Sequence, residues 1–258
     1  MTAAAVTAGP TQAPGWAAVT RIAPTGHPVE LTLPAAFGEH RWYANTRFTG
    51  PRLARQFFFA PAGEHRAVPT HLLPGARQRR VPVRGFDALV FEAPDRSDSA
   101  LVLAGPHHEA TTWFAGPAPD GAGLAELLSA FRFTDSPAGA ALVPVSDLLV
   151  AQSDVTVIGR SPRSTLLVRR VAEALPSLPD WAGMSLLGGE LWRAERLLAP
   201  REAALVAGTA HQWRYLLAGD SVAMDVVLHG PESGQPPLDL PADGLVDALS
   251  GLSGRWVG

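Results

Sequence analysis

The chain has 258 residues with a net charge of −3, and 47% of them are hydrophobic, so it carries enough apolar material for a packed core. It has no cysteine and no lysine, so all 21 basic residues are arginines, a bias typical of a GC-rich genome. These absences exclude disulfide frameworks, cysteine-ligated metals and enzymes that need a Schiff-base or phosphate-binding lysine, and the small net charge predicts no nucleic-acid partner.

The N-terminal segment, residues 1–24, is rich in Ala, Thr, Pro and Gly and has no charge before Arg21. It lacks the basic start and the Leu-rich run of a secretory signal, and its composition predicts a disordered segment. No apolar run approaches the length of about 18 residues that would indicate a membrane span. We therefore expect a cytoplasmic protein.

Residues 25–140 are predicted to form a first α+β unit, in which strands precede a helix. Apolar residues recur at helical spacing from Leu124 to Phe131 and predict a helix there. The four arginines between Arg77 and Arg84 predict a solvated hairpin flank, with an anion-binding site as the alternative. Apolar alternation or β-rich composition predicts strands over residues 29–33, 56–60, 86–92, 100–104 and 111–115.

Residues 141–258 are predicted to form a second α+β unit with a similar ending. A strand over His211–Leu217 leads into the hairpin turn Gly219-Asp220, and leucines from Leu245 onward predict a closing helix. Each half ends on a Gly-Pro loop, an Asp-Gly pair, a Leu-rich helix and an aromatic residue. This likeness is explained either by an internal duplication or by chance similarity in a chain rich in Ala, Gly and Leu. The expected fold is α+β, with antiparallel sheets covered by helices, either as two pseudo-symmetric repeats or as unrelated halves.

The first half closes on a hairpin after Gly85-Phe86, a strand pair, a loop and a helix ending in Leu128-Ser129-Ala130-Phe131-Arg132-Phe133. This arrangement resembles the PsbP/DcrB-like superfamily, whose fold is shared with a small Ran-binding protein. The Ser-Phe-Arg ending common in that family has one residue inserted here, and the resemblance covers residues 29–133 and, more faintly, the second half. It implies a helix-covered antiparallel sheet and a binding module, adaptor or chaperone without shared catalytic residues.

Residues with catalytic or metal-binding chemistry are few and poorly spaced. His107-His108-Glu109 is the densest cluster of potential ligands, but adjacent strand residues point to opposite faces. Ser161 is followed by Pro162, which would block the amide of an oxyanion hole. His211 with Asp220 and Ser221 permits a Ser-His-Asp arrangement, as chance trios in a chain of this size also do. We expect no cofactor, no stoichiometric metal and no catalytic residue.

The candidate binding residues are aromatic residues on strands and arginines on polar faces. Trp213 and Tyr215 share a strand face that either packs beneath a helix or forms an open docking surface. We expect a non-catalytic binding, adaptor or chaperone-like protein whose protein partner docks on a sheet face or between the halves. The alternatives are a small hydrolase or metal-assisted enzyme around His107 or His211, and a structural component of an assembly. The complete candidate set is Trp113, Trp213, Tyr215, Arg214, Arg79 and Arg80.

Overall fold

The computed structural model describes residues 15–51, 54–145, 150–186, 188–235, 237–238 and 242–257. Its centre is one antiparallel sheet of twelve strands, in the order β13-β14-β15-β16-β12-β11-β3-β4-β8-β7-β6-β5. In chain order these strands are β3 (Arg41–Thr49), β4 (Ala54–Pro61), β5 (Arg77–Val83), β6 (Phe86–Glu92), β7 (Asp98–Ala104), β8 (His108–Ala115), β11 (Ala151–Arg160), β12 (Ser164–Arg170), β13 (Met184–Leu186), β14 (Gly189–Glu195), β15 (Trp213–Ala218) and β16 (Val222–Leu228).

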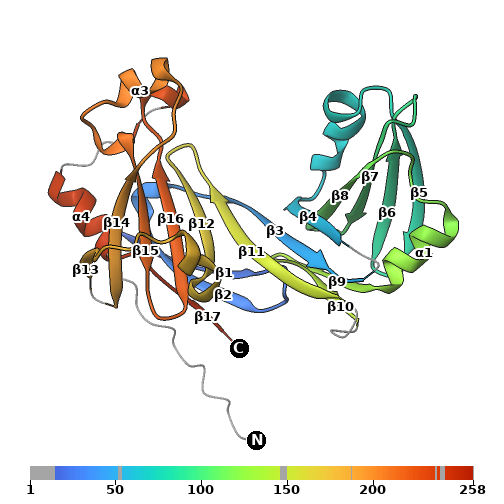
Figure 1. Cartoon of the computed structure of the whole chain (residues 1–258), viewed down its shortest axis with the longest axis horizontal. Coiled ribbons are helices and arrows are strands. Elements are labelled where there is room, and N and C mark those ends of the chain that lie inside the picture. The colour runs from blue at the N-terminus through green and yellow to red at the C-terminus, as the bar shows by residue number, and fades with distance from the viewer. Residues whose placement is uncertain are drawn as a thin grey trace, which may run out of the picture.

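The two halves of the chain meet in the middle of this sheet. Strand β3 from the first half pairs with β11 from the second, with a register shift between Ser153 and Thr156. In Figure 1 these two long strands cross between the first-half strands on the right and the second-half strands on the left. The pairing makes one continuous sheet out of segments more than a hundred residues apart.

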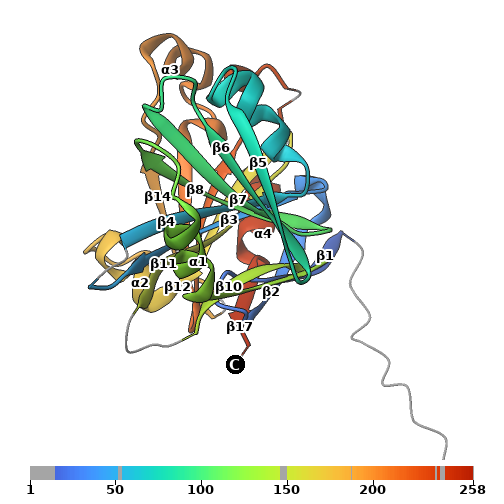
Figure 2. The same cartoon turned by 90° about the vertical axis from the view of Figure 1, so that its right-hand side faces the viewer.

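Two small sheets complete the β-structure. One contains β1 (Trp16–Ile22), β2 (Pro28–Pro34) and β17 (Ser253–Trp256), and the other is the hairpin of β9 (Phe131–Ser136) and β10 (Gly139–Pro144). Figures 1 and 2 place these strands together below the large sheet. The two small sheets approach closely at Gly139, where a Cβ atom would lie 2.5 Å from the carbonyl oxygen of Ile22, so a side chain does not fit there.

The helices are short and lie at the margins of the sheets. Asp120 caps the first of the two nine-residue helices, because its carboxylate accepts a hydrogen bond from the Gly123 amide at 2.8 Å. Other connections are single turns, among them η2 and η3 between β4 and β5. The helices and turns used below are η2 (Glu64–Ala67), η3 (Val68–Leu72), α1 (Gly121–Ser129), α2 (Val171–Ala174), α3 (Pro200–Val206), η5 (Ala210–Gln212), η6 (Pro231–Ser233) and α4 (Ala242–Ser250).

Most of the core lies on one face of the large sheet, which we call the core face, and a smaller cluster packs β6 and β7 against η3 on the other face. In the first half, the rings of Phe48, Phe57 and Phe131 contact one another with centroids 4.5 to 5.8 Å apart. In the second half, apolar residues of β11, β12, β15 and β16 pack with residues of β2, α4 and β17. The strands of the small sheets therefore supply most of the cover of the core face, and α1 and α4 each add a few residues at its two ends.

Two expectations from the sequence are corrected by this architecture. The α+β class with helix-covered sheets is wrong: the described fold is mostly antiparallel β-structure, and the helices are too few and too short to cover the sheets. The reason is that β3 pairs with β11 and joins the halves into one sheet, whose core face the strands of the small sheets cover. Part of the segment expected to be disordered, Trp16–Ile22, is strand β1 because it pairs along its length with β2, while residues 1–14 lie outside the described residues.

Several local predictions are confirmed. Helices α1 and α4 fall where leucines recur at helical spacing, and the hairpins β6–β7 and β15–β16 form as expected. His211 differs, since it lies in the turn η5 just before β15 and not in the strand. No helix in the described part of the chain is long and apolar enough to cross a membrane.

Candidate functional site

The face of the large sheet opposite the core face is uncovered where the two halves meet, and we call this region the open face. Side chains of β3, β4, β11 and β12 alternate between the two faces. On β4 the contrast is sharpest: the side chain of Phe57 is 1% exposed on the core face, and that of Phe58 is 44% exposed on the open face. In Figure 1 the small sheets lie beneath β3 and β11, and on the opposite face the turn η2 reaches Arg41 and Tyr43 through Glu64.

An apolar row crosses the open face perpendicular to the strands. Tyr43 on β3 lies opposite Ile158 on β11, and Ile158 lies opposite Leu167 on β12. All three side chains are half-buried, as expected of residues that touch one another but lack a covering layer. Phe58 on β4 lies on the same face, one residue pair further along β3, where its partner is Asn45. The row with Phe58 beside it places apolar side chains on this face, and exposed apolar side chains that gather on a surface mark interaction sites.

Arginines flank the apolar row. Arg41 and Arg160 lie opposite each other on β3 and β11, next to Tyr43 and Ile158 along the same strands. The guanidinium of Arg41 donates to Glu64 at 2.8 Å, and the Tyr43 hydroxyl donates to the same carboxylate oxygen at 2.9 Å. The guanidinium carbon of Arg160 lies 5.5 Å from the centre of the Tyr43 ring. Burial and the neighbouring Glu64 raise the pKa of Tyr43, so its hydroxyl stays protonated as a donor.

A buried carboxylate ends the row on the second-half side. Asp225 on β16 lies opposite Leu167, and one of its oxygens is 3.5 Å from an Arg214 nitrogen. The other oxygen is buried and has no hydrogen-bond partner in the described structure. Burial raises the pKa of Asp225, while the charges of Arg214 and Arg169 oppose that rise.

The candidate residues from the sequence fall in different environments. Trp213 and Tyr215 lie on the core face, where Tyr215 is buried and its hydroxyl donates to the Ala210 carbonyl at 2.9 Å. Trp113 is on the other face, but it packs in a small apolar cluster with Val68 of η3. These three aromatic residues therefore serve packing, and of the six candidates only Arg214 borders the open face.

Arg79 and Arg80 lie on β5, which is the last strand at one end of the large sheet. Arg79 donates to the Pro119 carbonyl at 3.1 Å, and Arg80 pairs with Asp87 at 2.7 Å. Charged side chains on an edge strand protect it from pairing with other chains. The edge position agrees with the solvated flank expected from the sequence.

The candidate histidines do not come together. His108 donates to Asp135 at 2.9 Å on one face, whereas Glu109 on the other face contacts His65 at 2.7 Å. His107 is exposed in the turn before β8, and His211 lies in the other half of the chain. Among the described residues, no group of three or more His, Asp or Glu side chains is arranged to hold a metal ion.

A Ser–His pair does exist, but it is structural. The Nε2 atom of His40 lies 2.9 Å from the Ser164 hydroxyl oxygen, and Ser164 is fully buried. A nucleophile must reach its substrate, which this hydroxyl cannot do. The Ser161 hydroxyl accepts from the Ser164 amide at 2.9 Å and donates to the Phe37 carbonyl, so it shapes the β11–β12 turn.

The half-buried position of His40 predicts a pH dependence of stability. Burial lowers the pKa of His40 to about 4, and nearby His229 contributes to the lowering. The unfolded chain therefore binds a proton at higher pH than the folded chain, and stability falls as the pH drops from about 6.5 toward 4. We expect His40→Gln to reduce this loss by about 1–2 kcal/mol, allowing for partial exposure of the ring. Urea unfolding at several pH values measures it, and an unchanged pH profile would contradict it.

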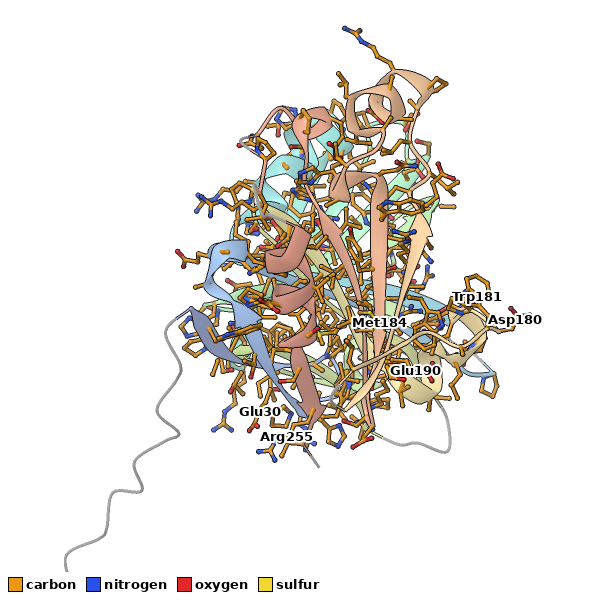
Figure 3. All side chains as sticks on the ribbon, turned by 90° about the vertical axis from the view of Figure 1, so that its left-hand side faces the viewer. Glu30, Asp180, Trp181, Met184, Glu190 and Arg255 are labelled. Carbon is orange, nitrogen blue, oxygen red and sulfur yellow. The ribbon has the colours of Figure 1, made fainter. Side chains whose placement is uncertain are left out.

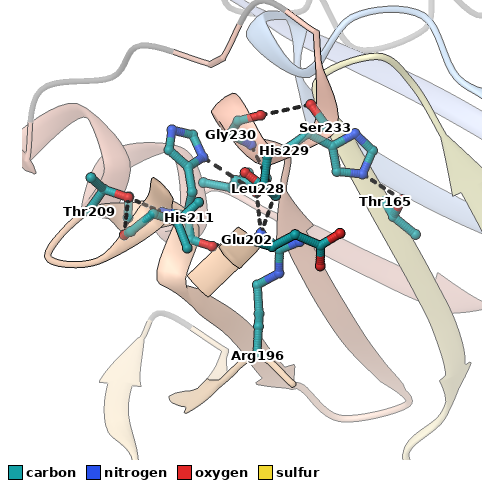
Figure 4. Close-up of polar contacts among 12 residues, drawn as sticks. Thr165, Arg196, Glu202, Thr209, His211, Leu228, His229, Gly230 and Ser233 are labelled. Carbon is teal, nitrogen blue, oxygen red and sulfur yellow. Dashed lines mark hydrogen bonds and ion pairs between the residues drawn. The ribbon is translucent and has the colours of Figure 1, made fainter. Parts of the chain in front are cut away.

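A second polar cluster fixes the loop after β16. Arg196 donates to the His211 carbonyl (Figure 4) and to Glu232 of η6, each at 2.7 Å. Both side chains of this ion pair are largely buried. The other oxygen of Glu232 is buried without a partner. The cluster ties β14, η5 and η6 together and leaves no room for a ligand, since a Cβ on Gly230 would already lie 2.6 Å from both Glu232 and His211.

Comparison with known proteins adds no relative to this description: no family model, no curated protein and no solved structure matches the chain. The class of protein is therefore defined by its own fold. It is a mostly antiparallel β-protein in which one sheet face is uncovered between the two halves. The resemblance to the PsbP/DcrB-like superfamily stays a prediction.

Proposed function

We propose that this chain is a non-catalytic binding protein of the adaptor or chaperone type, and that its protein partner docks on the open face. The observation that carries the proposal is the 44% exposure of Phe58 beside a half-buried apolar row, in the middle of an otherwise well-packed sheet. Burial of apolar surface contributes about 25 cal/mol per Å², and the uncovered chain lacks this contribution at the open face. A partner that covers the row would bury this surface, and the free energy of burial would then stabilise the complex.

The hydrolase or metal-assisted alternative has less support. Its two centres, His107 and His211, belong to different halves of the chain, and among the described residues neither belongs to a group of three or more His, Asp or Glu side chains arranged to hold a metal ion. The best Ser–His pair has a fully buried hydroxyl at Ser164. Tyr43 and Arg160 on the open face belong to the residue types that contribute most to protein–protein binding energy.

Two substitutions test the proposal. Phe58→Ala removes the most exposed aromatic side chain of the open face, and Arg160→Glu reverses the charge next to the apolar row. We expect each to lower the amount of partner captured from host extract by about tenfold, which corresponds to about 1.4 kcal/mol of binding energy. Quantitative pull-down with mass spectrometry measures the loss.

A matched control separates binding from folding. Leu205 on α3 is also exposed, at 53%, but lies away from the open face, so Leu205→Ala should leave capture unchanged. All three variants should unfold within about 1 kcal/mol of the wild type, because each changes a surface position. If Phe58→Ala and Arg160→Glu still capture every partner at the wild-type level, the proposed site is wrong.

A further inference from the structure

We infer that the partner contacts the open face with an acidic amphipathic α-helix, laid across strands β3, β11 and β12 along the apolar row. The inference rests on the proposed function, because it names the element that would occupy the same surface. Three features of the described residues support it: the direction of the row, its spacing and the charge around it.

The row runs across the strands and not along them. Tyr43, Ile158 and Leu167 belong to three neighbouring strands and are paired directly in register. An extended segment that pairs with a sheet lies at its edge, aligned with the strands, and contacts the side chains along one strand. A row perpendicular to the strands therefore suits an element that lies on the face.

The spacing of the row fits a helix. Neighbouring strands are about 4.8 Å apart, and an α-helix advances about 5.4 Å per turn. A helix lying across the strands can thus place one apolar side chain per turn, at positions i, i+3 or i+4, and i+7, over successive strands. A β-strand in the same direction presents a side chain to the sheet only every 6.6 Å or so, and loses register within three strands.

Four arginines flank the row and outnumber the three carboxylates nearest them: Glu64 pairs with Arg41, and Asp225 and Glu173 lie close enough to Arg169 to interact with its charge. Arg41 and Arg160 lie on one side, and Arg169 on β12 and Arg47 on β3 lie on the other. Among the described ion pairs, only Arg41 has a carboxylate partner, Glu64. Arg169 donates to the Ser177 hydroxyl at 3.2 Å, and Arg160 stacks on Tyr43. An apolar stripe with acidic residues on both flanks matches this arrangement, since opposite charges across an interface favour encounter and register.

Other exposed apolar surfaces lack this combination. Trp181 is 61% exposed and Met184 is 47% exposed near the β13 edge, but the charged residues labelled beside them in Figure 3, Asp180 and Glu190, are acidic. The apolar pocket beneath α1, lined by Phe57, Phe86 and Leu127 among others, is closed by its own side chains and is too narrow for a ligand of ordinary size.

Site-specific photo-crosslinking tests the inference. The photoreactive residue p-benzoylphenylalanine is introduced at Ile158 in the full-length chain, expressed in the host, and irradiated in cells. The crosslinked peptide is then identified by mass spectrometry. The same residue at Val246 on α4, which is 47% exposed and lies on the other side of the sheet, is the control.

The outcomes separate the inference from the proposed function. Crosslinks from Ile158, absent from Val246, to a segment with apolar residues at i, i+3 or i+4, and i+7 between acidic residues support the inference. That segment, as a synthetic peptide, should bind about five- to tenfold more weakly to Arg160→Glu than to the wild type, and more weakly in high salt. Crosslinks to a basic segment, to a segment in which apolar and polar residues alternate, to nucleic acid or to lipid would contradict the acidic helix. They would still be consistent with the open face as a binding surface. No crosslink beyond that of the control overturns the proposed function itself.

Discussion

Replacing Phe57 by alanine should lower the free energy of unfolding by about 3–5 kcal/mol, whereas the same change at Phe58 should alter it by less than about 1 kcal/mol. The two residues are neighbours in β4, but Phe57 packs on Phe48 and Phe131 in the core and Phe58 lies on the open face. The loss at Phe57 combines the transfer of a buried ring with the cavity that it leaves.

Chemical denaturation of both variants measures the difference. The pair is matched in residue type, strand and chain position, so a contrast in stability can arise only from the face on which each ring lies. Similar losses at both positions would mean that the open face is packed like the core, and the proposed docking surface would have to be abandoned. A small loss at Phe57 would contradict the described core of the first half.

Replacing Arg196 by alanine should also destabilise the chain by about 3–5 kcal/mol, because it leaves Glu232 buried without its partner. The exposed pair Arg255–Glu30, also 2.7 Å apart and seen at the lower edge in Figure 3, is the matched control. Arg255→Ala should cost no more than about 1 kcal/mol, since water solvates both charges of an exposed pair.

The pH dependence of the Arg196→Ala variant provides a second readout. Burial tends to raise the pKa of Glu232, but the hydrogen bonds from Arg196 and from backbone amides outweigh it and lower the pKa below its ordinary 4.5. In the wild type, this carboxylate therefore stabilises the fold above pH 4.5, and that contribution is lost as the pH falls through the lowered pKa. In the variant, protonation at low pH removes the charge of the unpaired Glu232 carboxylate. The difference in unfolding free energy between the wild type and the variant should therefore become smaller toward low pH. A difference that stays constant or widens in acid would show that Arg196 acts through packing alone.

Elements with a local signal were predictable from the sequence. The spacing of Leu124 to Phe131 placed α1, and the turn Gly219-Asp220 placed the β15–β16 hairpin, because both depend on residues close in the chain. The divergence of His108 and Glu109 to opposite faces also followed from strand geometry. The sequence allowed the aromatic face of β15 to be either packed or open. In the structure, Trp213 and Tyr215 pack with the core of the second half.

The sequence carries one signal for the open face. Phe57, Phe58 and Phe59 are consecutive in a strand, so at least one ring had to lie on the face opposite the other two. Which face would be covered could not be read from β4 itself, since the cover is supplied by residues such as Phe131 from a later part of the chain. For the same reason, the sequence did not predict that Tyr43, Ile158 and Leu167 lie on the open face.

The sequence by itself determined a cysteine- and lysine-free chain with two halves of similar ending, several hairpins and two short Leu-rich helices. Only the tertiary structure decided that β3 pairs with β11, that β2 pairs with β17, and that strands cover the core face in place of the expected helices. Strand pairing between residues 30 and 255 depends on backbone hydrogen bonds that any sequence can make and on packing partners distant in the chain. The fold class and the candidate docking surface both follow from these long-range pairings, which local composition and periodicity do not encode.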